Sequence, residues 1–317
     1  MKENIQQTAL TKHFRALGTS ISLTVFGTLD QTVLEKSADL VNHYEDVLTV
    51  NRDHSQLMSV NQAAGKFPVQ VEASVYQLTK LAVEKSRANF GFNAAIGPLV
   101  KLWHIGFSDA KVPSEQQISE RLSLIDPWQI ELNDADQSIF LKKAGMEIDL
   151  GAIAKGYIAD RLKDFLVKKG VNSAIINLGG NVLCIGSKPD GTPFKVGIQK
   201  PFADRNETEA VMDITGKSVV SSGIYERCFK QNGKLYHHIL NPKTGYPYDN
   251  SLISVTIISD QSVDGDALST TCFALGLEDG LKFAEKKGVQ AVLITEDYEL
   301  HYTDGFQDEI NVTDVES

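Results

Sequence analysis

Short apolar runs separated by turn residues fill the sequence from residue 173 to 259, and this pattern restricts the fold more than any other feature. Seven runs have strand-like composition, with Gly, Pro, Asn and Asp between them. Two similar runs, 289–295 and 298–303, follow near the C-terminal end. Short strands that follow one another through tight turns pair antiparallel, so the pattern favours antiparallel sheets. The seven runs are 173–178, 182–186, 194–199, 209–214, 218–223, 234–240 and 252–259.

Helical periodicity is confined to other parts of the chain. Apolar residues recur at helical spacing in 31–48 and 72–89, and a short helix is expected at 114–123 within an otherwise loop-rich stretch, 105–137. We also expect a strand within 14–26, a strand at 146–150 and helices over 151–170 and 264–287. Strands and helices are grouped rather than alternating, which predicts an α+β fold with largely antiparallel sheets and flanking helices.

Composition excludes some classes of protein. The 317 residues carry a net charge of −10 with acids and bases interspersed, so a general nucleic-acid binder is not expected. Cys184, Cys228 and Cys272 are too far apart for a metal motif, which predicts small buried side chains. No run approaches the ~18 apolar residues of a membrane span. The first 14 residues are polar and lack the apolar core of a signal peptide, which is compatible with a mature form from which a signal has been removed.

Two glycine-containing junctions could receive a ligand. In IDLGAIAKGYIAD (148–160) a strand leads through Gly151 into a helix, whose first N–H groups and Lys155 could bind phosphate while the Ala152 carbonyl faces a cation. An ordinary helix entry, with Asp149 near the cap and Lys155 solvated, explains the same residues. In INLGGNVLCIG (176–186), Gly179 and Gly180 permit positive φ or close ligand approach, and a plain hairpin turn is the alternative.

A hairpin is expected within 221–250. Asn232–Gly233 is a hairpin turn signal that would fold the strand after Tyr225 against 236–240. This pairing would place Arg227 and His238 within reach of one ligand, whereas a lone histidine is usually structural. His237 and His238 should lie on opposite faces of the strand, so at most one faces a site.

The stretch VDGDALSTTCFALG (263–276) places a carboxylate and a hydroxyl on one helix face. Asp266 and Thr270 are four residues apart, and this pair of oxygen ligands suits Mg²⁺. The alternative is that Asp264 or Asp266 caps the helix and Thr270 bonds back to the preceding turn.

The order and wording of these stretches resemble the ApbE family of FAD:protein FMN transferases. The resemblance covers nearly the whole chain and predicts one domain over 1–317, related to the T-fold, with two subdomains and the FAD site between them. The matching stretches are ALGTSISLTV (16–25), LTVNRDHSQLMSVN (48–61), GFNAAIGPLVKLW (91–103), IDLGAIAKGYIADRL (148–162), INLGGNV (176–182), SGIYERCFKQNGKLYHHILNPKTGYP (222–247) and DALSTTCFALG (266–276).

The resemblance implies a Mg²⁺-dependent enzyme. Such an enzyme transfers the FMN part of FAD to a threonine or serine hydroxyl of a target flavoprotein and releases AMP. The metal would lie on the Ala152 carbonyl, Asp266 and Thr270, and His238 is our candidate for the base, with Asp266 or a metal-bound hydroxide as alternatives. The other positions implied for FAD binding are Leu17, Val50, Asn93, Ala94, Ala95, Asp149, Lys155, Gly179, Gly180, Tyr225, Arg227 and Leu240.

Two departures and two rival functions accompany the resemblance. Leu17 stands where the family often has Met, and Val50 where an aromatic residue is frequent, so aromatic stacking on FAD would have to come from elsewhere. The rivals are an FAD pyrophosphatase, which gives FMN and AMP, and a non-catalytic FAD-binding protein. The resemblance also implies an extracytoplasmic enzyme, membrane-anchored as a precursor, with a cytoplasmic enzyme as the alternative.

Overall fold

The structure of the chain is a computed structural model that describes residues 9–27, 30–204 and 207–314. Its largest element is a sheet with the strand order β1-β2-β6-β7-β10-β13-β14-β15, in which all neighbouring strands are antiparallel. The expected α+β fold with largely antiparallel sheets is therefore confirmed. The strands are β1 (Ala9–Ala16), β2 (Thr19–Phe26), β6 (Ala174–Asn177), β7 (Asn181–Ile185), β10 (Ser218–Gly223), β13 (Leu252–Ser259), β14 (Gln290–Thr295) and β15 (Leu300–Tyr302).

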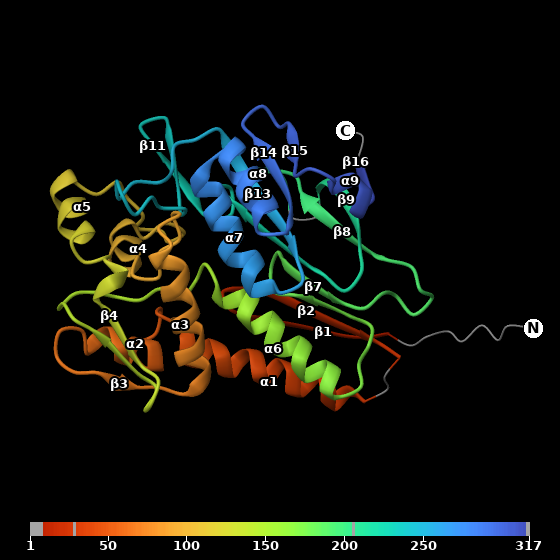
Figure 1. Cartoon of the computed structure of the whole chain (residues 1–317), viewed down its shortest axis with the longest axis horizontal. Helices are drawn as coiled ribbons and strands as arrows, with labels where there is room; N and C mark the ends of the chain where they lie inside the picture. The colour runs from red at the N-terminus through yellow and green to blue at the C-terminus, as the bar shows by residue number, and fades with distance from the viewer. Residues whose placement is uncertain (1–8, 28–29, 205–206, 315–317) are drawn as a thin grey trace, which may run out of the picture.

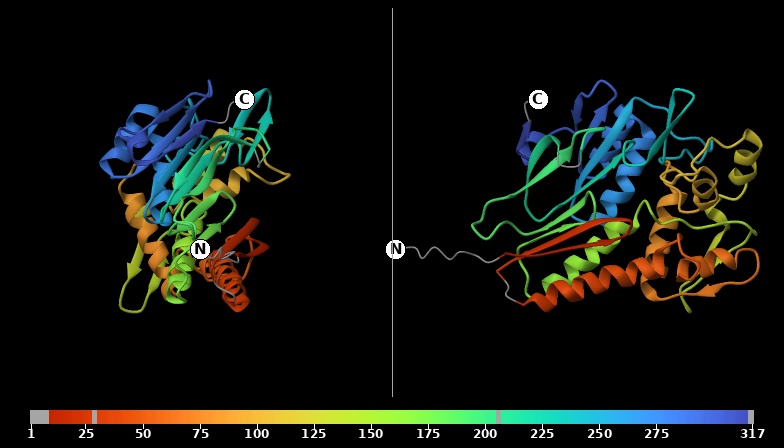
Figure 2. Two further views of the ribbon diagram at one scale, coloured as in Figure 1. Left: turned by 90° about the vertical axis from the view of Figure 1, so that its right-hand side faces the viewer. Right: turned by 180° about the vertical axis from the view of Figure 1, so that it is seen from behind.

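Both faces of the central strands are covered. Four helices pack on one face: α1 (Gln31–Leu48), α6 (Ala154–Lys168), α7 (Ser262–Leu275) and α8 (Leu277–Lys286). A sheet of β8 (Phe194–Gln199), β9 (Thr208–Ile214) and β16 (Val312–Asp314), with α9 (Phe306–Glu309), covers the other face. Side chains of β13 alternate between the two layers: Val255 and Ile257 pack with the helices, and Ile258 packs with β8 and β9. Figures 1 and 2 show this arrangement from the front, the side and behind.

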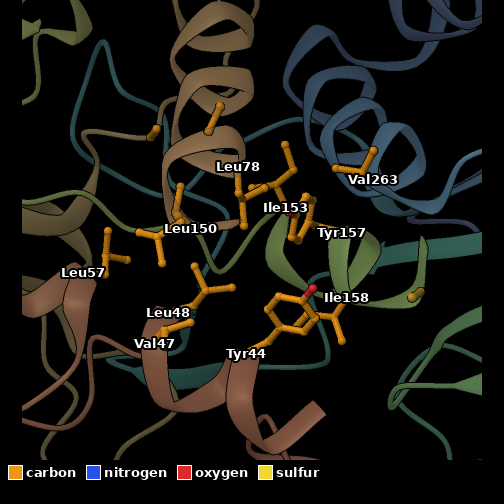
Figure 3. Packing of buried hydrophobic residues seen from close by; sticks show 14 of the residues in the cluster. Tyr44, Val47, Leu48, Leu57, Leu78, Leu150, Ile153, Tyr157, Ile158 and Val263 are labelled. Atoms are coloured by element: carbon orange, nitrogen blue, oxygen red, sulfur yellow. The ribbon is translucent and has the colours of Figure 1, made fainter. Parts of the chain in front are cut away.

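The segment from 49 to 150 forms a smaller lobe, drawn orange to yellow-green in Figure 1. Its core is continuous with that of the main sheet, because Leu57 and Leu78 belong to the same buried cluster as Tyr44 of α1 and Ile158 of α6 (Figure 3). The lobe contains α2 (Gln56–Gln62), α3 (Ala73–Arg87), α4 (Gly97–Trp103), α5 (Glu115–Leu122), a 3₁₀ turn (Pro127–Gln129), and the strands β3 (Val69–Gln70), β4 (Ile130–Asn133) and β5 (Ser138–Leu141). A separate hairpin is formed by β11 (Cys228–Gln231) and β12 (Lys234–His237).

Helices α6 and α7 approach each other closely at Gly156. A Cβ added there would lie 2.3 Å from the Ser262 carbonyl oxygen and 2.7 Å from the Val263 Cα. At the same contact, the carboxylate of Asp160 on α6 accepts the backbone N–H groups of Ser262 and Val263, each at 2.9 Å. Asp160 therefore caps the N-terminus of α7 from a neighbouring helix, and neither Asp264 nor Asp266 has the capping role that the sequence allowed. Asp264 instead pairs with Lys85 at 2.8 Å.

Two expectations from the sequence are wrong in detail. Residues 146–150 do not form a strand: only an isolated bridge from Glu147 to Ile96 is present, and Ile148 bonds to the side chain of Asn61. The helix expected over 264–287 is broken at Gly276, where φ is 82°. The strand expected within 14–26, from the alternation after Gly18, is confirmed as β2, whereas β1 before it was not expected. Helices α2 and α4 were not expected.

The other expectations concern the cysteines, membrane-spanning segments and the polar first residues of the chain. Cys184 and Cys272 are buried, and Cys228 is half-buried, so they behave largely as small packed side chains. No helix in the described part of the chain is long and apolar enough to cross a membrane. Residues 1–8, which contain much of the polar leader, lie outside the described residues.

The close approach at Gly156 predicts an unusual response to alanine. In an exposed helix interior, Gly→Ala stabilises by roughly 0.5–1 kcal/mol. Here the added methyl group meets backbone of α7, so we expect Gly156→Ala to lower the free energy of unfolding by about 1–3 kcal/mol. Urea denaturation followed by circular dichroism measures this, with the exposed Lys168→Ala as a control that should change stability by less than about 0.5 kcal/mol. An unchanged or higher stability of Gly156→Ala would contradict the packing described.

Candidate functional site

Asp266 lies where α6, α7 and β7 meet. Its carboxylate is buried, with 6% of the residue exposed, and it accepts two hydrogen bonds. The Gly156 N–H of α6 donates to Oδ2 at 2.5 Å, and the Asn181 side-chain amide of β7 donates to Oδ1 at 3.2 Å. Both donors are neutral, so they orient the carboxylate without cancelling its charge. Asp266 is thus a fixed, buried acid at the junction of three elements.

The bond from Gly156 to Asp266 changes the start of α6. In a regular helix the Gly156 N–H would donate to the carbonyl four residues earlier, that of Ala152. Because this N–H is used by Asp266, the Ala152 carbonyl accepts no hydrogen bond from the described residues. The Thr270 hydroxyl, one turn after Asp266 on α7, likewise has no hydrogen-bond partner in the described part of the chain. A carboxylate, a carbonyl and a hydroxyl therefore have oxygen lone pairs to offer on adjoining turns.

This donor set fits a hard divalent cation. Mg²⁺ prefers oxygen ligands and usually takes few from the protein, with water or substrate phosphate completing its shell. Within residues 9–27, 30–204 and 207–314, no group of three or more His, Cys, Asp or Glu side chains forms a metal cluster. The set of Ala152, Asp266 and Thr270 is of another kind, because two of its three oxygens belong to a backbone carbonyl and a hydroxyl.

The charge around Asp266 is consistent with cation binding. Burial raises the pKa of its carboxyl to about 6, although the charge of Lys155, the Gly156 N–H and the Asn181 amide act in the opposite direction. Lys155 lies in the first turn of α6 and is half-buried. The charge of the same lysine also contributes to lowering the pKa of His238, so Lys155 lies within electrostatic range of both the acid and the histidine.

The β11–β12 hairpin positions Arg227 and His238 as expected. Its turn residues, Asn232 and Gly233, have φ values of 52° and 80°, which suit a two-residue hairpin turn. The backbone N–H of His238 and its ring Nδ1 both bond to the Arg227 carbonyl, at 3.1 and 3.2 Å. Because a carbonyl only accepts, Nδ1 carries the hydrogen and Nε2 has a lone pair, the tautomer that a general base requires.

The two adjacent histidines have different environments. Burial and the charge of Arg227 lower the pKa of His238 to about 3, so its ring is neutral at physiological pH. His237 is buried, and its Nε2 donates to the Tyr248 carbonyl at 2.9 Å while its Nδ1 accepts from the Ile239 N–H. His237 is therefore structural. His238 is the first residue after β12. The different orientations of the two rings therefore do not follow from the alternation of side chains along a strand alone, because the backbone conformation changes between them.

The N–H groups at the start of α6 are only partly available for phosphate. Gly151 N–H donates to Asp149 Oδ1 at 2.7 Å, and the N–H groups of Ile153 and Ala154 both donate to the Leu150 carbonyl. The N–H groups of Ala152 and Lys155 have no hydrogen-bond partner among the described residues. The expected cluster of donors over 151–155 thus reduces to these two.

Asp149 and Arg227 lie close enough to interact electrostatically. Burial raises the pKa of the Asp149 carboxyl, while the Gly151 N–H and the charge of Arg227 lower it. A Cβ on Gly106 would lie 3.1 Å from the Arg227 side chain, so the 104–107 turn borders this position. The 149–155 segment and the hairpin therefore face a common space.

Two glycine turns meet at another side of the site. Gly179 and Gly180 have φ values of 72° and 99°, as the sequence predicts, and both N–H groups donate to the Asn177 side chain. A Cβ on Gly179 would lie 2.2 Å from the Thr19 hydroxyl, so this turn contacts the β1–β2 turn. Leu17, with φ of 54°, belongs to that second turn. Leu17 and the two glycines are thus neighbours.

The other positions implied for FAD have varied settings. The Asn93 side chain is already bonded, donating to the Ile125 carbonyl at 2.8 Å and accepting from the Ala95 N–H at 2.9 Å. It lines a pocket of about 240 Å³ that includes none of the other implied positions. Ala94, Ala95 and Leu240 are buried, Val50 is half-buried just after α1, and Tyr225 is half-buried with its ring edge-on to Phe202.

Sequence reasoning missed two residues at this site. Asp160 and Asn181 both lie inside the motifs already considered, yet their contacts with α7 were not anticipated. Asp160 follows Ile158 and Ala159 on the buried side of α6, and an acid at such a position was the available signal. Asn181 offered no signal, because an asparagine after two glycines is equally typical of a turn.

Comparisons with known proteins identify relatives and structural neighbours of the chain. The chain is 46% identical to an FAD:protein FMN transferase of Klebsiella pneumoniae (strain 342) over 86% of its length and 84% of the relative. It is 38% identical to an FAD:protein FMN transferase of Treponema pallidum (strain Nichols), covering 89% of this chain and 82% of the relative. The crystal structure of the ApbE protein from Thermotoga maritima superposes with a TM-score of 0.87 at 28% identity, covering 95% of this chain and 98% of that one.

The family itself is shown by its sequence model. Residues 17–293 match it, a span that begins at the β1–β2 turn and ends within β14. This span contains every residue named for the site, from Leu17 to Thr270. The chain belongs to the ApbE family.

Proposed function

We propose that this chain is a Mg²⁺-dependent FAD:protein FMN transferase that joins the FMN part of FAD to a threonine or serine hydroxyl of a target flavoprotein. The observation that carries the proposal is the Asp266 carboxylate together with the Ala152 carbonyl and the Thr270 hydroxyl, which have no partner within the described part of the chain, in a chain 46% identical to a relative of that name. FAD is the substrate, and the acceptor is a second protein. The acidic net charge of −10 gives no reason to expect a nucleic acid as partner.

The reaction forms one bond and breaks one. The acceptor oxygen attacks the phosphorus on the FMN side of the pyrophosphate, and the bond from that phosphorus to the bridging oxygen breaks, so AMP leaves. A bound Mg²⁺, held by Asp266, Thr270 and the Ala152 carbonyl, would supply charge neutralisation at the pyrophosphate. The Lys155 ammonium group offers positive potential to the pyrophosphate oxygens. The backbone N–H groups of Ala152 and Lys155, which have no acceptor among the described residues, can act in the same way.

His238 is suited to take the proton of the acceptor hydroxyl. Its ring is neutral, its Nδ1–H is fixed by the Arg227 carbonyl, and Nε2 has no hydrogen-bond partner among the described residues. The low pKa of the ring makes it a weak base, so the proton is transferred as the oxygen–phosphorus bond forms. Arg227, exposed next to it, is available to FAD or to the acceptor.

An assay separates the transferase from its two rivals. The protein is incubated with FAD, Mg²⁺ and a candidate acceptor, and both AMP and covalent flavin fluorescence on the acceptor are followed. AMP together with labelled acceptor supports the transferase. AMP without labelled acceptor identifies the pyrophosphatase. The absence of both products identifies a non-catalytic flavin-binding protein.

The place of action is a separate proposal, supported by the family resemblance. We propose that the enzyme acts outside the cytoplasm, with a membrane anchor on its precursor. Cell fractionation with an antibody against the native protein tests this, and recovery in the cytoplasmic fraction would contradict it.

The metal ligands predict a graded loss of activity. We expect Asp266→Ala to lower Mg²⁺-dependent AMP release by about 100-fold or more, because the buried charge that holds the cation is removed. Thr270→Val should have a smaller effect of about 10-fold, since a single neutral ligand is lost. The control is Thr271→Val, whose hydroxyl only bonds back to the Ala267 carbonyl at 2.9 Å. Normal turnover by Asp266→Ala would place the metal elsewhere.

The two histidines predict opposite phenotypes. His238→Gln should lower the transfer rate by about 100-fold with FAD binding retained, because the base is lost and the binding surface is not. His237→Gln should lower the melting temperature while the folded protein keeps its turnover number, since that ring is bonded to Tyr248 within the core. Stopped assays and flavin fluorescence titrations measure these quantities. A His238→Gln variant that retains near-full transfer would rule out His238 as the base.

A further inference from the structure

A buried chain of hydrogen-bonded polar side chains leads away from Asp266 into the protein. Asn181 of β7 donates to Asp266 Oδ1 at 3.2 Å, and Ser262 at the start of α7 donates its hydroxyl to Asn181 Oδ1 at 2.8 Å. The Ser218 hydroxyl of β10 in turn donates to Ser262 Oγ at 2.8 Å. Asn181 is 1% exposed, and both serines are 0% exposed. Water therefore does not substitute for any of these bonds.

The direction of the chain is fixed by its chemistry. Ser262 has one hydroxyl hydrogen, which it gives to the carbonyl oxygen of Asn181, so the NH₂ group of that amide must face Asp266. A flipped amide would place its oxygen against a carboxylate oxygen of Asp266, where the two acceptors repel each other, and it would no longer accept the Ser262 hydroxyl hydrogen. The Ser218 hydroxyl also lies 3.2 Å from the Val182 carbonyl, so the orientation of Asn181 depends on Asp266 and Ser262 and not on Ser218.

Two donors on different oxygens determine the plane of a carboxylate, whereas one donor leaves it free to rotate. Gly156 of α6 holds Oδ2 from the helix layer, and Asn181 of β7 holds Oδ1 from the central sheet. The remaining lone pairs of Asp266 then point in fixed directions, along which a cation can be bound. An amide is well suited to this role, because it orients the acid and leaves its negative charge for the cation.

We propose that Asn181 is a positioning residue that sets the divalent-cation affinity of Asp266, with Ser262 fixing the orientation of its amide. The proposal rests on the metal site of the proposed function. It extends that function by naming residues that are not among the proposed metal ligands and act on Asp266 through hydrogen bonds. Partners of this kind typically change metal affinity by about 10–100-fold when removed.

Manganese binding tests the role directly, without turnover. The dissociation constant of Mn²⁺, used as a paramagnetic substitute for Mg²⁺, is measured from the free-ion spin resonance signal in the absence of FAD. We expect Asn181→Leu, which keeps the branched arrangement of side-chain heavy atoms and removes the donor, to weaken binding by about 10-fold or more. Ser262→Ala keeps the amide and removes only its orienting hydroxyl, so a smaller loss of several-fold is expected. Circular dichroism confirms that each variant is folded.

A control separates positioning from general destabilisation. Asn250→Leu removes an amide that donates to the Phe273 carbonyl at the other end of α7, at 2.7 Å, without contact to Asp266. It should lower the melting temperature and leave the Mn²⁺ constant unchanged. An unchanged constant in folded Asn181→Leu overturns the proposal. If that variant does not fold, Ser262→Ala decides alone, and an unchanged constant there overturns it.

The outcome for the unmodified protein distinguishes the two levels of inference. If it binds Mn²⁺ and both variants bind equally well, only the role of Asn181 and Ser262 is overturned. If the unmodified protein binds no Mn²⁺, the metal site itself is overturned and the positioning role with it. Weaker binding in the variants and unchanged binding in Asn250→Leu support both.

Discussion

The contact between α6 and α7 is the constraint on which the rest of the structure depends. Each helix supplies a carboxylate to the backbone of the other: Asp160 of α6 accepts the first N–H groups of α7, and Asp266 of α7 accepts the Gly156 N–H of α6. Gly156 has no side chain to separate them. Val263 of α7 lies beside Ile153 and Tyr157 of α6 in the same packed cluster (Figure 3). The two helix starts are therefore fixed relative to each other by both polar and apolar contacts.

This exchange couples stability to the site. A buried N–H group left without an acceptor costs about 1–3 kcal/mol, so losing either carboxylate would destabilise the helix that it serves. The same exchange draws the Gly156 N–H away from Ala152, and that carbonyl accepts no hydrogen bond from any residue that the structure describes. The feature that holds the helices together is thus also the feature that opens a ligand position at the start of α6. Selection for packing and selection for the site act on the same few atoms.

The sequence predicted elements whose signals are local. Helix 31–48 and the hairpin turn at Asn232–Gly233 were found because apolar spacing and turn residues depend on near neighbours only. The strand expected at 146–150 failed because its extended backbone bonds to Asn61 and to the Ala94 carbonyl, which no local pattern encodes. The single helix expected over 264–287 is two helices, because the helix breaks at Gly276. A glycine at this position is a helix-ending signal in the sequence, but the expectation did not take it into account.

The site shows the same division. Asp266 and Thr270 were identified as a pair by their spacing, and Arg227 and His238 by the hairpin that joins their strands. The spacing of residues within a motif does not predict which distant residue each of them contacts. Asn181 meets Asp266 across 85 residues, and Asp160 meets Ser262 across 102. The family resemblance assigns these motifs to one site, but it does not predict which of their residues are in contact.

Asp160 and Asp266 show why one buried acid is structural and the other is suited to a ligand. Burial raises the pKa of both carboxyls. Asp160 faces the N-terminus of α7, where two N–H groups and the helix dipole favour its charge. Asp266 lies inside its own helix, near a carbonyl and a hydroxyl that have no hydrogen-bond partner among the described residues. Oxygen atoms gathered around a buried carboxylate repel one another unless positive charge lies between them, and Lys155 supplies only part of it. A bound divalent cation would satisfy all three oxygens at once.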